Sequence, residues 1–535
     1  MGKQLFKETR KITKLLLRQN QFKIFLWLIG LVGITLTVAN VYPTVYVTQE
    51  DIMGFALTME NPAMNAMLGP NYAIEDYNIG AVFANEMLLF TVIAVGVMNI
   101  LLVSSSTRDD EEEGRLEMVR ALPVGRLAYL TASGIMITIV DGILFLLTAV
   151  GLGFVSASGM IWEASFLYGT LLGVTGLFFA ALTALCAQLA ETSKGATALS
   201  LGVLIAAYVI RAIGDVDSEG LALLSPLGWV VRTEVFVNND WWPIGALLSS
   251  TIVLLIAALY FNLKRDINTG LLPDRKGKVH ASRFLKTPIG LTWHLEKTNL
   301  IAWTVVLFLL SAAFGAILGE LEVYFSDMDI IQAYFSEESG ISLTEQFIAL
   351  LISIMSVFTA VPVMSIILKL KKEEKQGRVE NYYSRAVSRN TILSSYYIIS
   401  LASVIVMQVM TGLGLYLTAN QVLEEGLELS MIMKTTLVYV PAIWLVIGLA
   451  TLLVGVFPKG GSLAWFYIVF SFIVIYIGDL VDFPDWVINF SAFTHVPQIP
   501  IEEMDWKALS SLSGIAVVLT LIGLIGYNKR DIQNQ

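Results

Sequence analysis

Long apolar runs alternate with short polar connections along the whole chain. Twelve of these runs are close to twenty residues long or longer, and about 20 apolar residues in a helix span the roughly 30 Å hydrocarbon core of a bilayer. The twelve runs are residues 24–47, 81–104, 128–155, 164–187, 196–213, 243–263, 300–319, 347–369, 391–417, 433–456, 461–478 and 508–527. The pattern predicts an all-α, polytopic membrane protein with twelve transmembrane helices.

The composition is that of a membrane protein and excludes several other classes. The chain has 535 residues, of which 56% are hydrophobic and 15% are charged, whereas about 25% of residues are charged in an ordinary soluble protein. We therefore exclude a soluble enzyme, a nucleic-acid-binding protein and a disordered chain. Cys186 is the only cysteine, so the chain cannot form an intrachain disulfide, and the three histidines are separated in sequence, so we expect no metal site.

The distribution of Lys and Arg predicts the orientation of the spans. If the N-terminus is cytoplasmic, about 30 of the 34 basic residues lie on the cytoplasmic side, as the positive-inside rule requires. The connections 105–126 and 369–389 are then cytoplasmic, and the connections 48–80 and 320–346, which contain no Lys or Arg, are external. We therefore expect both termini in the cytoplasm.

Short motifs occur twice, in the same order and at the same points of the predicted topology, with an offset of 263 to 265 residues. The matching pairs are 113–117 with 376–380, Arg126 with Arg389, 213–215 with 477–479, 240–241 with 505–506, and 264–267 with 529–532. Each half has an even number of spans, so both halves begin and end on the same side. The sequence therefore predicts two parallel six-helix repeats, 24–267 and 300–535, joined by a cytoplasmic segment at 268–299.

The cytoplasmic connections after the second span of each half share one plan. In 105–126, a charged stretch leads to Gly114 and then to a short run that places Leu116, Val119, Ala121 and Leu122 on one predicted helical face, before Pro123. The connection 369–389 has the same order. A short amphipathic helix of this kind suits contact with a soluble partner, and a solvated connector is the alternative interpretation.

In the first connection, Glu-Glu-x-Gly-x-Leu-Glu is followed by Pro-x-x-Arg, and this arrangement resembles the coupling-helix region of ABC-2 type exporter permeases. The second connection departs from it, with Ala386 in place of Pro123. The resemblance implies that the chain docks two copies of a separate ABC ATPase subunit, which bind the ATP and Mg. The implied ATPase-coupling residues are Glu112, Glu113, Gly114, Arg115, Leu116, Glu117, Arg120, Arg126, Gly377, Arg378, Glu380, Arg385 and Arg389.

Two further features resemble this family. The basic segment 3–22 resembles its interfacial connecting helix, which we expect at residues 1–23, with a second such helix within 268–299; plain anchoring of the first span by positive charge is the alternative. The fused twelve-span form, with Asn61, Pro62 and Met64 and the repeated Arg-Asp-Ile tails, resembles bacterial permeases linked to export of polyether ionophores of the tetronasin and narasin type. This resemblance implies a location in the bacterial plasma membrane.

No GxxxxGK[ST] phosphate-binding loop occurs in the sequence. We therefore expect no ATP or other cofactor bound by this chain, which would be a transport subunit rather than an enzyme. The same absence is compatible with an ion- or proton-coupled secondary drug transporter, which is the alternative hypothesis.

Charged side chains within a bilayer are costly and are functional candidates by default. Asp141 lies near the centre of the third span, and Glu86 lies within the second span toward its outer end. Asp141 either lines a cavity, binds a cation or is protonated, or it forms a structural hydrogen bond to a neighbouring helix. Glu86 either contributes to a cargo path or simply reaches the interface at the outer end of its span. The candidate translocation-path residues are Glu86, Asn99, Asp141, Met98, Gln408 and Met407. Because few charges lie within the spans, we expect hydrophobic or amphipathic small-molecule cargo.

Overall fold

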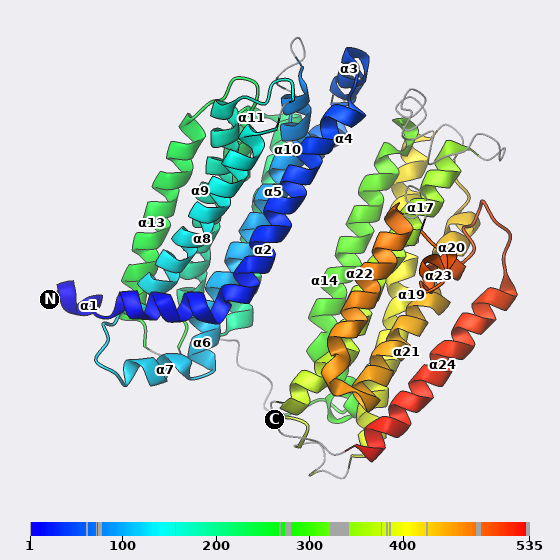
Figure 1. Ribbon diagram of the computed structural model, residues 1–535. Coiled ribbons are helices and arrows are strands. Elements are labelled where there is room, and N and C mark those ends of the chain that lie inside the picture. The colour runs from blue at the N-terminus through cyan, green and yellow to red at the C-terminus, as the bar shows by residue number, and fades with distance from the viewer. Residues whose placement is uncertain are drawn as a thin grey trace. The chain divides into compact units, whose positions relative to one another are not determined.

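The protein is all-α and has the twelve membrane-spanning helices that the sequence predicts. The computed structural model describes residues 2–59, 62–70, 72, 77–155, 157–266, 269–272, 280–320, 342–375, 377–380, 384, 387–423, 426–477 and 483–530. Within these residues there is no strand, and twelve helices are long and apolar enough to cross a membrane. The chain divides into two compact units, Met1–Gly277 and Lys278–Gln535, which are coloured blue to green and green to red in Figure 1.

Unit 1 is built around a central helix, α9. Its spans are α2 (Thr9–Val45), α5 (Ile79–Ser104), α8 (Ala128–Gly153), α9 (Trp162–Leu189), α10 (Ser193–Asp217) and α13 (Trp242–Lys264). Helix α9 packs against α5, α8, α10 and α13, and most of its residues are buried. Small residues allow this packing: a Cβ atom on Gly169 would lie 2.7 Å from the carbonyl oxygen of Phe145 in α8. Close backbone approach through glycine is typical of helices that associate in membranes.

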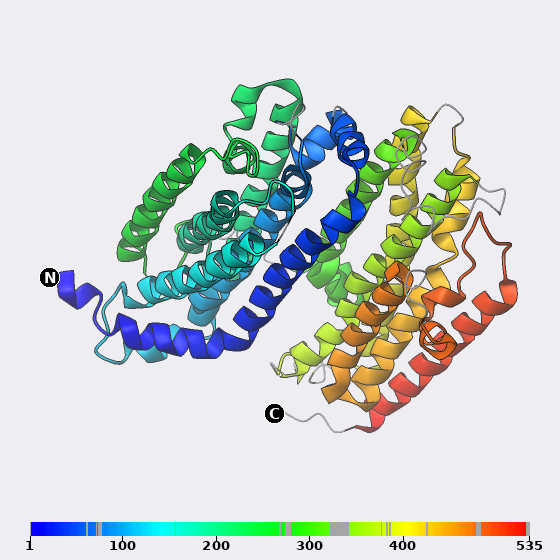
Figure 2. The ribbon, with the colours of Figure 1, turned by 45° about the horizontal axis from the view of Figure 1, so that its top comes forward.

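The first span and the basic segment before it form one continuous helix. Helix α2 begins at Thr9 and runs to Val45, across the boundary expected at residue 23. The reason is that no Gly or Pro interrupts residues 9–29, so nothing in the sequence ends the helix there. Figures 1 and 2 show that the N-terminal part of α2 turns away from the direction of the rest of the helix.

Unit 2 has six spans in the same order. They are α14 (Pro288–Ile317), α17 (Leu343–Lys375), α19 (Arg389–Val422), α20 with α21 (Leu429–Leu437 and Val440–Val456), α22 (Gly461–Ile477) and α24 (Trp506–Lys529). Helix α14 also runs without a break through the expected connecting helix and the span that follows. Thr287 caps its N-terminus by accepting a hydrogen bond from the amide of Gly290 at 3.1 Å, and Pro288 occupies the first turn.

Helices α21 and α24 of unit 2 pack with almost no space between their backbones. A Cβ atom on Gly448 would lie 2.8 Å from the carbonyl oxygen of Ala516, and one on Gly455 would collide with the carbonyl of Gly523. The corresponding fourth and sixth spans of unit 1, α9 and α13, have Ala180, Ala181 and Ala184 and a cavity on this side. The two units thus have the same order of helices, but the fourth and sixth spans pack more tightly in unit 2 than in unit 1.

Candidate functional site

In unit 1, the connection predicted to be a cytoplasmic coupling element forms a compact hairpin. Helix α5 continues through a π-helical turn, η1 (Ser105–Asp109), and a short helix, α6 (Asp110–Glu112), and Gly114 then reverses the chain into α7 (Arg115–Arg120). Gly114 has φ +74°, a left-handed conformation that strains residues with a Cβ atom. The equivalent residue in unit 2, Gly377, has φ +69°. The turn conformation therefore explains why both connections have glycine at this point.

A buried carboxylate, Glu111, fixes this hairpin to the end of the sixth span. Arg265, which follows α13, donates to both carboxylate oxygens of Glu111 at 2.9 and 2.7 Å, and Nη1 of Arg108 lies 3.1 Å from the same carboxylate. All three side chains are buried. Arg265 also donates to Oε1 of Gln188 in α9 at 3.1 Å, so α9 is included in the same network.

The same contact occurs in unit 2. Arg530, which follows α24, donates to both carboxylate oxygens of Glu374 at 2.8 and 2.5 Å. Glu374 lies 263 residues after Glu111, and Arg530 lies 265 residues after Arg265. Glu374 is buried, as Glu111 is, while Arg530 is partly exposed.

Two more contacts of unit 1 occur at equivalent positions of unit 2. Within the hairpin, Nε of Arg115 donates to Asp110 at 2.6 Å, and Nη1 of Arg378 donates to Glu373 at 3.1 Å. At the start of the third span, Arg126 donates to the main-chain oxygen of Arg265 at 3.0 Å, as Arg389 does to that of Arg530 at 2.6 Å. We call these three contacts in each unit the loop clamp.

The N-terminal segment is tied to the same region. The amides of Gly125 and Leu127 donate to the main-chain oxygens of Lys7 and Leu5 at 3.1 and 3.0 Å. A Cβ atom on Gly125 would collide with the carbonyl of Leu5. The basic segment is therefore bonded directly to the chain that follows α7.

Helix α7 presents both buried and exposed predicted residues. Leu116 is buried, whereas Met118 and Leu122 are 66% and 61% exposed, and Glu117 is also exposed. Leu122 does not share the buried face expected for it because α7 ends at Arg120, before Leu122 and Pro123. Proline disfavours the helical conformation of the residue before it.

The other predicted coupling residues have local roles. Glu112 accepts a hydrogen bond from the amide of Ser193 at the start of α10, and Glu113 pairs with Arg115 at the surface. Arg120 is half-buried beside Arg126. In unit 2, Glu380 is exposed next to Val379, which is buried, and Arg385 lies outside the described residues.

Glu111 is the first residue of the Glu-Glu-x-Gly-x-Leu-Glu motif, but the sequence did not indicate Arg108, Asp110, Gln188 or Arg265 as site residues, although the structure places them in this network. One available signal was the repeated motif at 264–267 and 529–532, which contains both clamp arginines. Among the described residues, no group of three or more His, Cys, Asp or Glu side chains is placed to hold a metal ion.

The structure brings two of the candidate translocation-path residues together. Asn99 of α5 donates to Oδ1 of Asp141 in α8 at 3.0 Å, and Gly176 of α9 leaves the space that this pair fills. Asn99 and Asp141 are buried inside unit 1, as is Met98. Glu86 lies elsewhere in the unit, where it accepts a hydrogen bond from Tyr42 of α2.

In unit 2, Gln408 of α19 donates to Ser356 of α17 at 2.8 Å, and both side chains are buried beside Met407. This polar bridge joins the second and third spans, as the Asn99–Asp141 pair does in unit 1. The two bridges are not at equivalent positions. At the 263-residue offset, Ser356 lies six residues from the equivalent of Asn99 on α17, and Gln408 lies four residues from the equivalent of Asp141 on α19.

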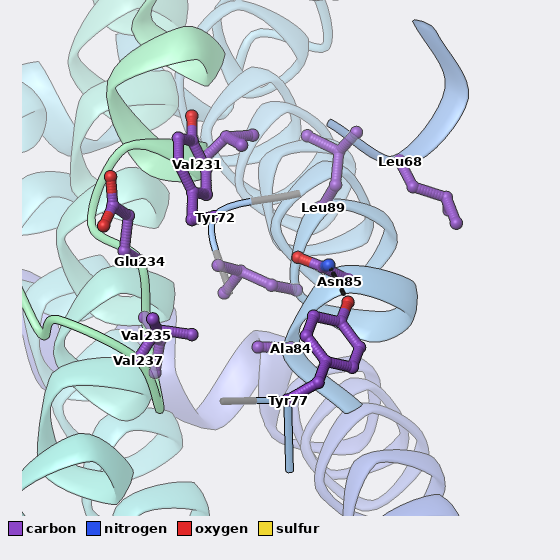
Figure 3. Close-up of a pocket in the computed structure, with 11 residues that line it drawn as sticks. Leu68, Tyr72, Tyr77, Ala84, Asn85, Leu89, Val231, Glu234, Val235 and Val237 are labelled. Atoms are coloured by element: carbon purple, nitrogen blue, oxygen red, sulfur yellow. Dashed lines mark hydrogen bonds between the residues drawn. The ribbon is translucent and has the colours of Figure 1, made fainter. Parts of the chain in front are cut away.

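A small cavity lies among the segments that connect the other ends of the unit 1 spans (Figure 3). Asn85 donates to the hydroxyl of Tyr77 there, and Tyr72 and Glu234 complete part of the lining. Burial raises the pKa of Tyr72 and of Tyr77, so both phenols remain neutral at physiological pH. The cavity measures about 20 Å³, room for about one water molecule, which is too small for drug-sized cargo.

Comparison with known proteins assigns the chain to a family. The family model described as "Multidrug efflux system permease Rv1217c, C-terminal domain" matches residues 10–261 and 285–528. The multidrug efflux system permease protein Rv1217c of Mycobacterium tuberculosis is 30% identical over 537 residues, which cover 99% of this chain and 96% of that protein. The chain, with its twelve apolar spans, is thus a membrane permease that belongs to the Rv1217c family of multidrug efflux system permeases.

Proposed function

We propose that this permease is the membrane subunit of an ATP-driven ABC exporter of the ABC-2 type, which moves hydrophobic or amphipathic compounds out of the cell. The observation that carries the proposal is the loop clamp, which holds the hairpin after the second span to the end of the sixth span in both units. A transporter driven by a soluble ATPase needs such a firm link between its cytoplasmic surface and its spans.

The recurring contacts also support two six-helix repeats of the same topology. Three clamp contacts join residues that correspond at offsets of 263 and 265 residues. If the two units arose by duplication, each presents one docking element with the same internal support. This is the basis for proposing two copies of an ABC ATPase subunit, one for each unit, which bind ATP and Mg.

The proposed docking surface of unit 1 is the tip formed by α7 and the residues after it. Met118 and Leu122 are exposed there, with Glu117 beside them. Exposed apolar side chains with flanking charges are typical of protein–protein contact sites. Force applied to this tip reaches α13 through Glu111 and Arg265, because a buried, multiply bonded ion pair resists separation.

The remaining features of the proposal concern location and cargo. We place the protein in the bilayer of the bacterial plasma membrane with both termini in the cytoplasm, since positive charge is concentrated on that side. The name of the Mycobacterium tuberculosis relative supports drug-like cargo. Polyether ionophores are one candidate class.

The test is substrate-stimulated ATP hydrolysis by the permease co-purified with its ATPase. A panel of apolar and amphipathic compounds is expected to raise the hydrolysis rate for some members, because cargo and nucleotide states are energetically coupled in such a machine. An ATPase alone provides the control. A chain that captures no ATPase, or whose ATPase ignores every compound, would contradict the proposal.

A secondary transporter driven by ions or protons is the second candidate, and Asp141 is the observation that favours it. This carboxylate is buried within the spans, and in the described residues its side chain contacts Asn99 and forms no ion pair. Carboxylates of this kind carry protons in some transporters. Asp141→Asn separates the two candidates: it abolishes pH-driven transport if the carboxylate moves a proton, and it preserves ATP-driven export if the group is structural.

A further inference from the structure

An apolar cavity of about 230 Å³ lies within the membrane-spanning part of unit 1. Residues of α5, α8, α9 and α13 line it, and Phe6 of the N-terminal segment contributes to the wall. An apolar protein cavity of about 150 Å³ is large enough to bind benzene. This cavity is therefore large enough for part of an alkyl chain or for a ring system.

The space exists because the surrounding helices carry small residues. Gly134 of α8 and Ala180, Ala181 and Ala184 of α9 are part of the lining. A Cβ atom on Gly134 would meet no other atom within 4 Å. A larger side chain at Gly134 would thus occupy the cavity without displacing the backbone.

A second, polar cavity lies one helical turn further toward the loop clamp. Leu130 lines both cavities. On α9 the lining moves from Ala184 to Gln188, and on α13 it moves from Leu259 to Asn262. One turn of helix rises about 5.4 Å, so the two cavities are stacked along the same helices.

The polar cavity carries an excess of positive charge. Its charged lining consists of Arg108, Arg120, Arg126, Arg265 and the single carboxylate Glu111. Glu111 is already bonded to Arg265 and Arg108. Four arginines and one carboxylate leave the lining of this cavity with a net positive charge.

In the described part of the chain, neither Arg120 nor Arg126 forms a salt bridge; Arg120 is half-buried and Arg126 is exposed. Arg126 donates to the main-chain oxygen of Arg265, and Arg120 reaches that of Arg126 at 3.5 Å. Nε of Arg120 is buried and makes no hydrogen bond there. Burial, with a smaller contribution from the charge of Arg126, lowers the pKa of Arg120, while Glu111 acts in the opposite direction.

We propose that these stacked cavities form a binding site for an amphiphilic carboxylate, with its apolar body among Gly134 and the α9 alanines and its carboxylate between Arg120 and Arg126. The proposal rests on the proposed export function and names the class of cargo that it recognises. Guanidinium groups bind carboxylates through charge-assisted hydrogen bonds, and the apolar cavity removes the rest of the ligand from water.

The polar cavity is small. It measures about 20 Å³, and a space of about 10–15 Å³ holds one water molecule. One oxygen of a carboxylate fits in such a space.

Unit 2 lacks both determinants of the site. At the offset that aligns Arg126 with Arg389, Gly134 corresponds to Tyr397 and Arg120 corresponds to Tyr383. Tyr397 packs against the buried core of its own unit. The carboxylate site is therefore a property of unit 1.

The site is tested by direct binding to the purified full chain in phosphatidylcholine nanodiscs, without ATPase or ATP. The probes are a dansyl-labelled undecanoic acid and its primary amide, followed by fluorescence. We expect the acid to bind about tenfold more tightly than the amide, the effect of about 1.4 kcal/mol from a charge-assisted bond. Arg120→Gln removes this preference and Arg120→Lys retains most of it.

The tail cavity has its own variant and a matched control. Gly134→Tyr, which introduces the residue type of unit 2, weakens binding of both acid and amide by about tenfold. Gly142→Tyr changes neither affinity, because Gly142 is also in α8 and has open space around its Cβ position but does not line the cavity.

Equal affinity for acid and amide, an unchanged preference in Arg120→Gln, or unchanged binding in Gly134→Tyr would overturn the proposal. Strong competition by phosphatidylglycerol in the nanodisc would also overturn it, since the occupant would then be a phospholipid. Because binding is measured without nucleotide, its failure leaves ATP-driven export intact. Conversely, failure of export leaves a positive binding result standing.

Discussion

Glu111 is the residue on which the loop clamp of unit 1 most depends, because it lies between Arg108 and Arg265 in a buried network. Removing the charge of one partner in a buried ion pair is strongly destabilising, since the other charge is left unpaired. We expect Glu111→Gln to lower the free energy of unfolding by roughly 3–5 kcal/mol. Thermal unfolding of the purified chain measures this loss.

The control for Glu111→Gln is Glu117→Gln, which changes the same residue type on the exposed face of α7. Surface substitutions of this kind usually change stability by less than about 0.5 kcal/mol. Equal losses in the two variants would show that the buried network does not stabilise the unit.

Gly114 provides a second test at a single residue. Gly114→Ala is expected to cost about 1–2 kcal/mol, because the left-handed conformation is unfavourable for a residue with a Cβ atom. Gly134→Ala, within α8, is expected to be neutral or stabilising, since alanine favours helix and the space is open. Chemical denaturation of both variants gives the comparison, and a harmless Gly114→Ala would rule out the turn as the reason for this glycine.

Single residues were predictable from the sequence when their chemistry was unusual for their position. Asp141 stands out because a carboxylate in an apolar span is costly. Asn99 was also a candidate, but its pairing with Asp141, 42 positions later, could not be predicted, because sequence spacing within one helix gives no information about contacts between helices. The Glu111–Arg265 pair spans 154 positions and was missed for the same reason.

Whole elements were predicted more completely than their ends. Each of the twelve predicted spans is a helix in the structure, because a run of about 20 apolar residues has few other stable forms in a bilayer. Helices α2 and α14 begin earlier than the apolar runs, since hydropathy marks the membrane and not the helix. Helix α7 ends earlier than the amphipathic pattern suggested, before Pro123.

Helix α7 is the element whose exposed tip should determine ATPase binding. Met118→Asp combined with Leu122→Asp is expected to weaken binding of the ATPase by at least about tenfold, as loss of an apolar contact residue at an interface typically does. The permease itself should remain folded, since both side chains are exposed. The measurement is the affinity of the purified ATPase for purified permease that is immobilised on a surface.

The matched control is Leu224→Asp, because Leu224 is also a highly exposed leucine of unit 1 but lies between the short helices that follow α10. It should leave ATPase affinity unchanged. Charge reversal at Glu113 and Glu117 should also weaken docking, and normal affinity in all of these variants would remove α7 from the docking surface.

At the scale of the whole molecule, the two units have the same clamp contacts but differ in how these contacts are buried. The clamp carboxylate Glu374 pairs with one arginine that is partly exposed, whereas Glu111 pairs with two buried arginines. We expect Glu374→Gln to be less destabilising than Glu111→Gln, because solvent screens the charge that remains. The unfolding midpoints of the two variants test this expectation. A larger loss of stability in Glu374→Gln than in Glu111→Gln would contradict it.

The sequence predicted two repeats because short motifs recur with an offset of 263 to 265 residues. The motifs also contain the arginines of the clamp but not its carboxylates, and the contacts themselves could not be predicted. The differences between the units were less visible: the tightly closed α21–α24 pair and the cavity of unit 1 both depend on where small residues face.

The central claim is that ATP hydrolysed by a separate subunit drives transport through this permease. It is tested most directly in sealed vesicles that contain the permease, the ATPase and a fluorescent amphiphile, with either ATP or a pH gradient as the energy source. We predict uphill transport with ATP, none with an ATPase variant that binds but does not hydrolyse ATP, and none with the pH gradient alone. Uphill transport by the permease alone in a pH gradient, without ATP, would contradict the claim.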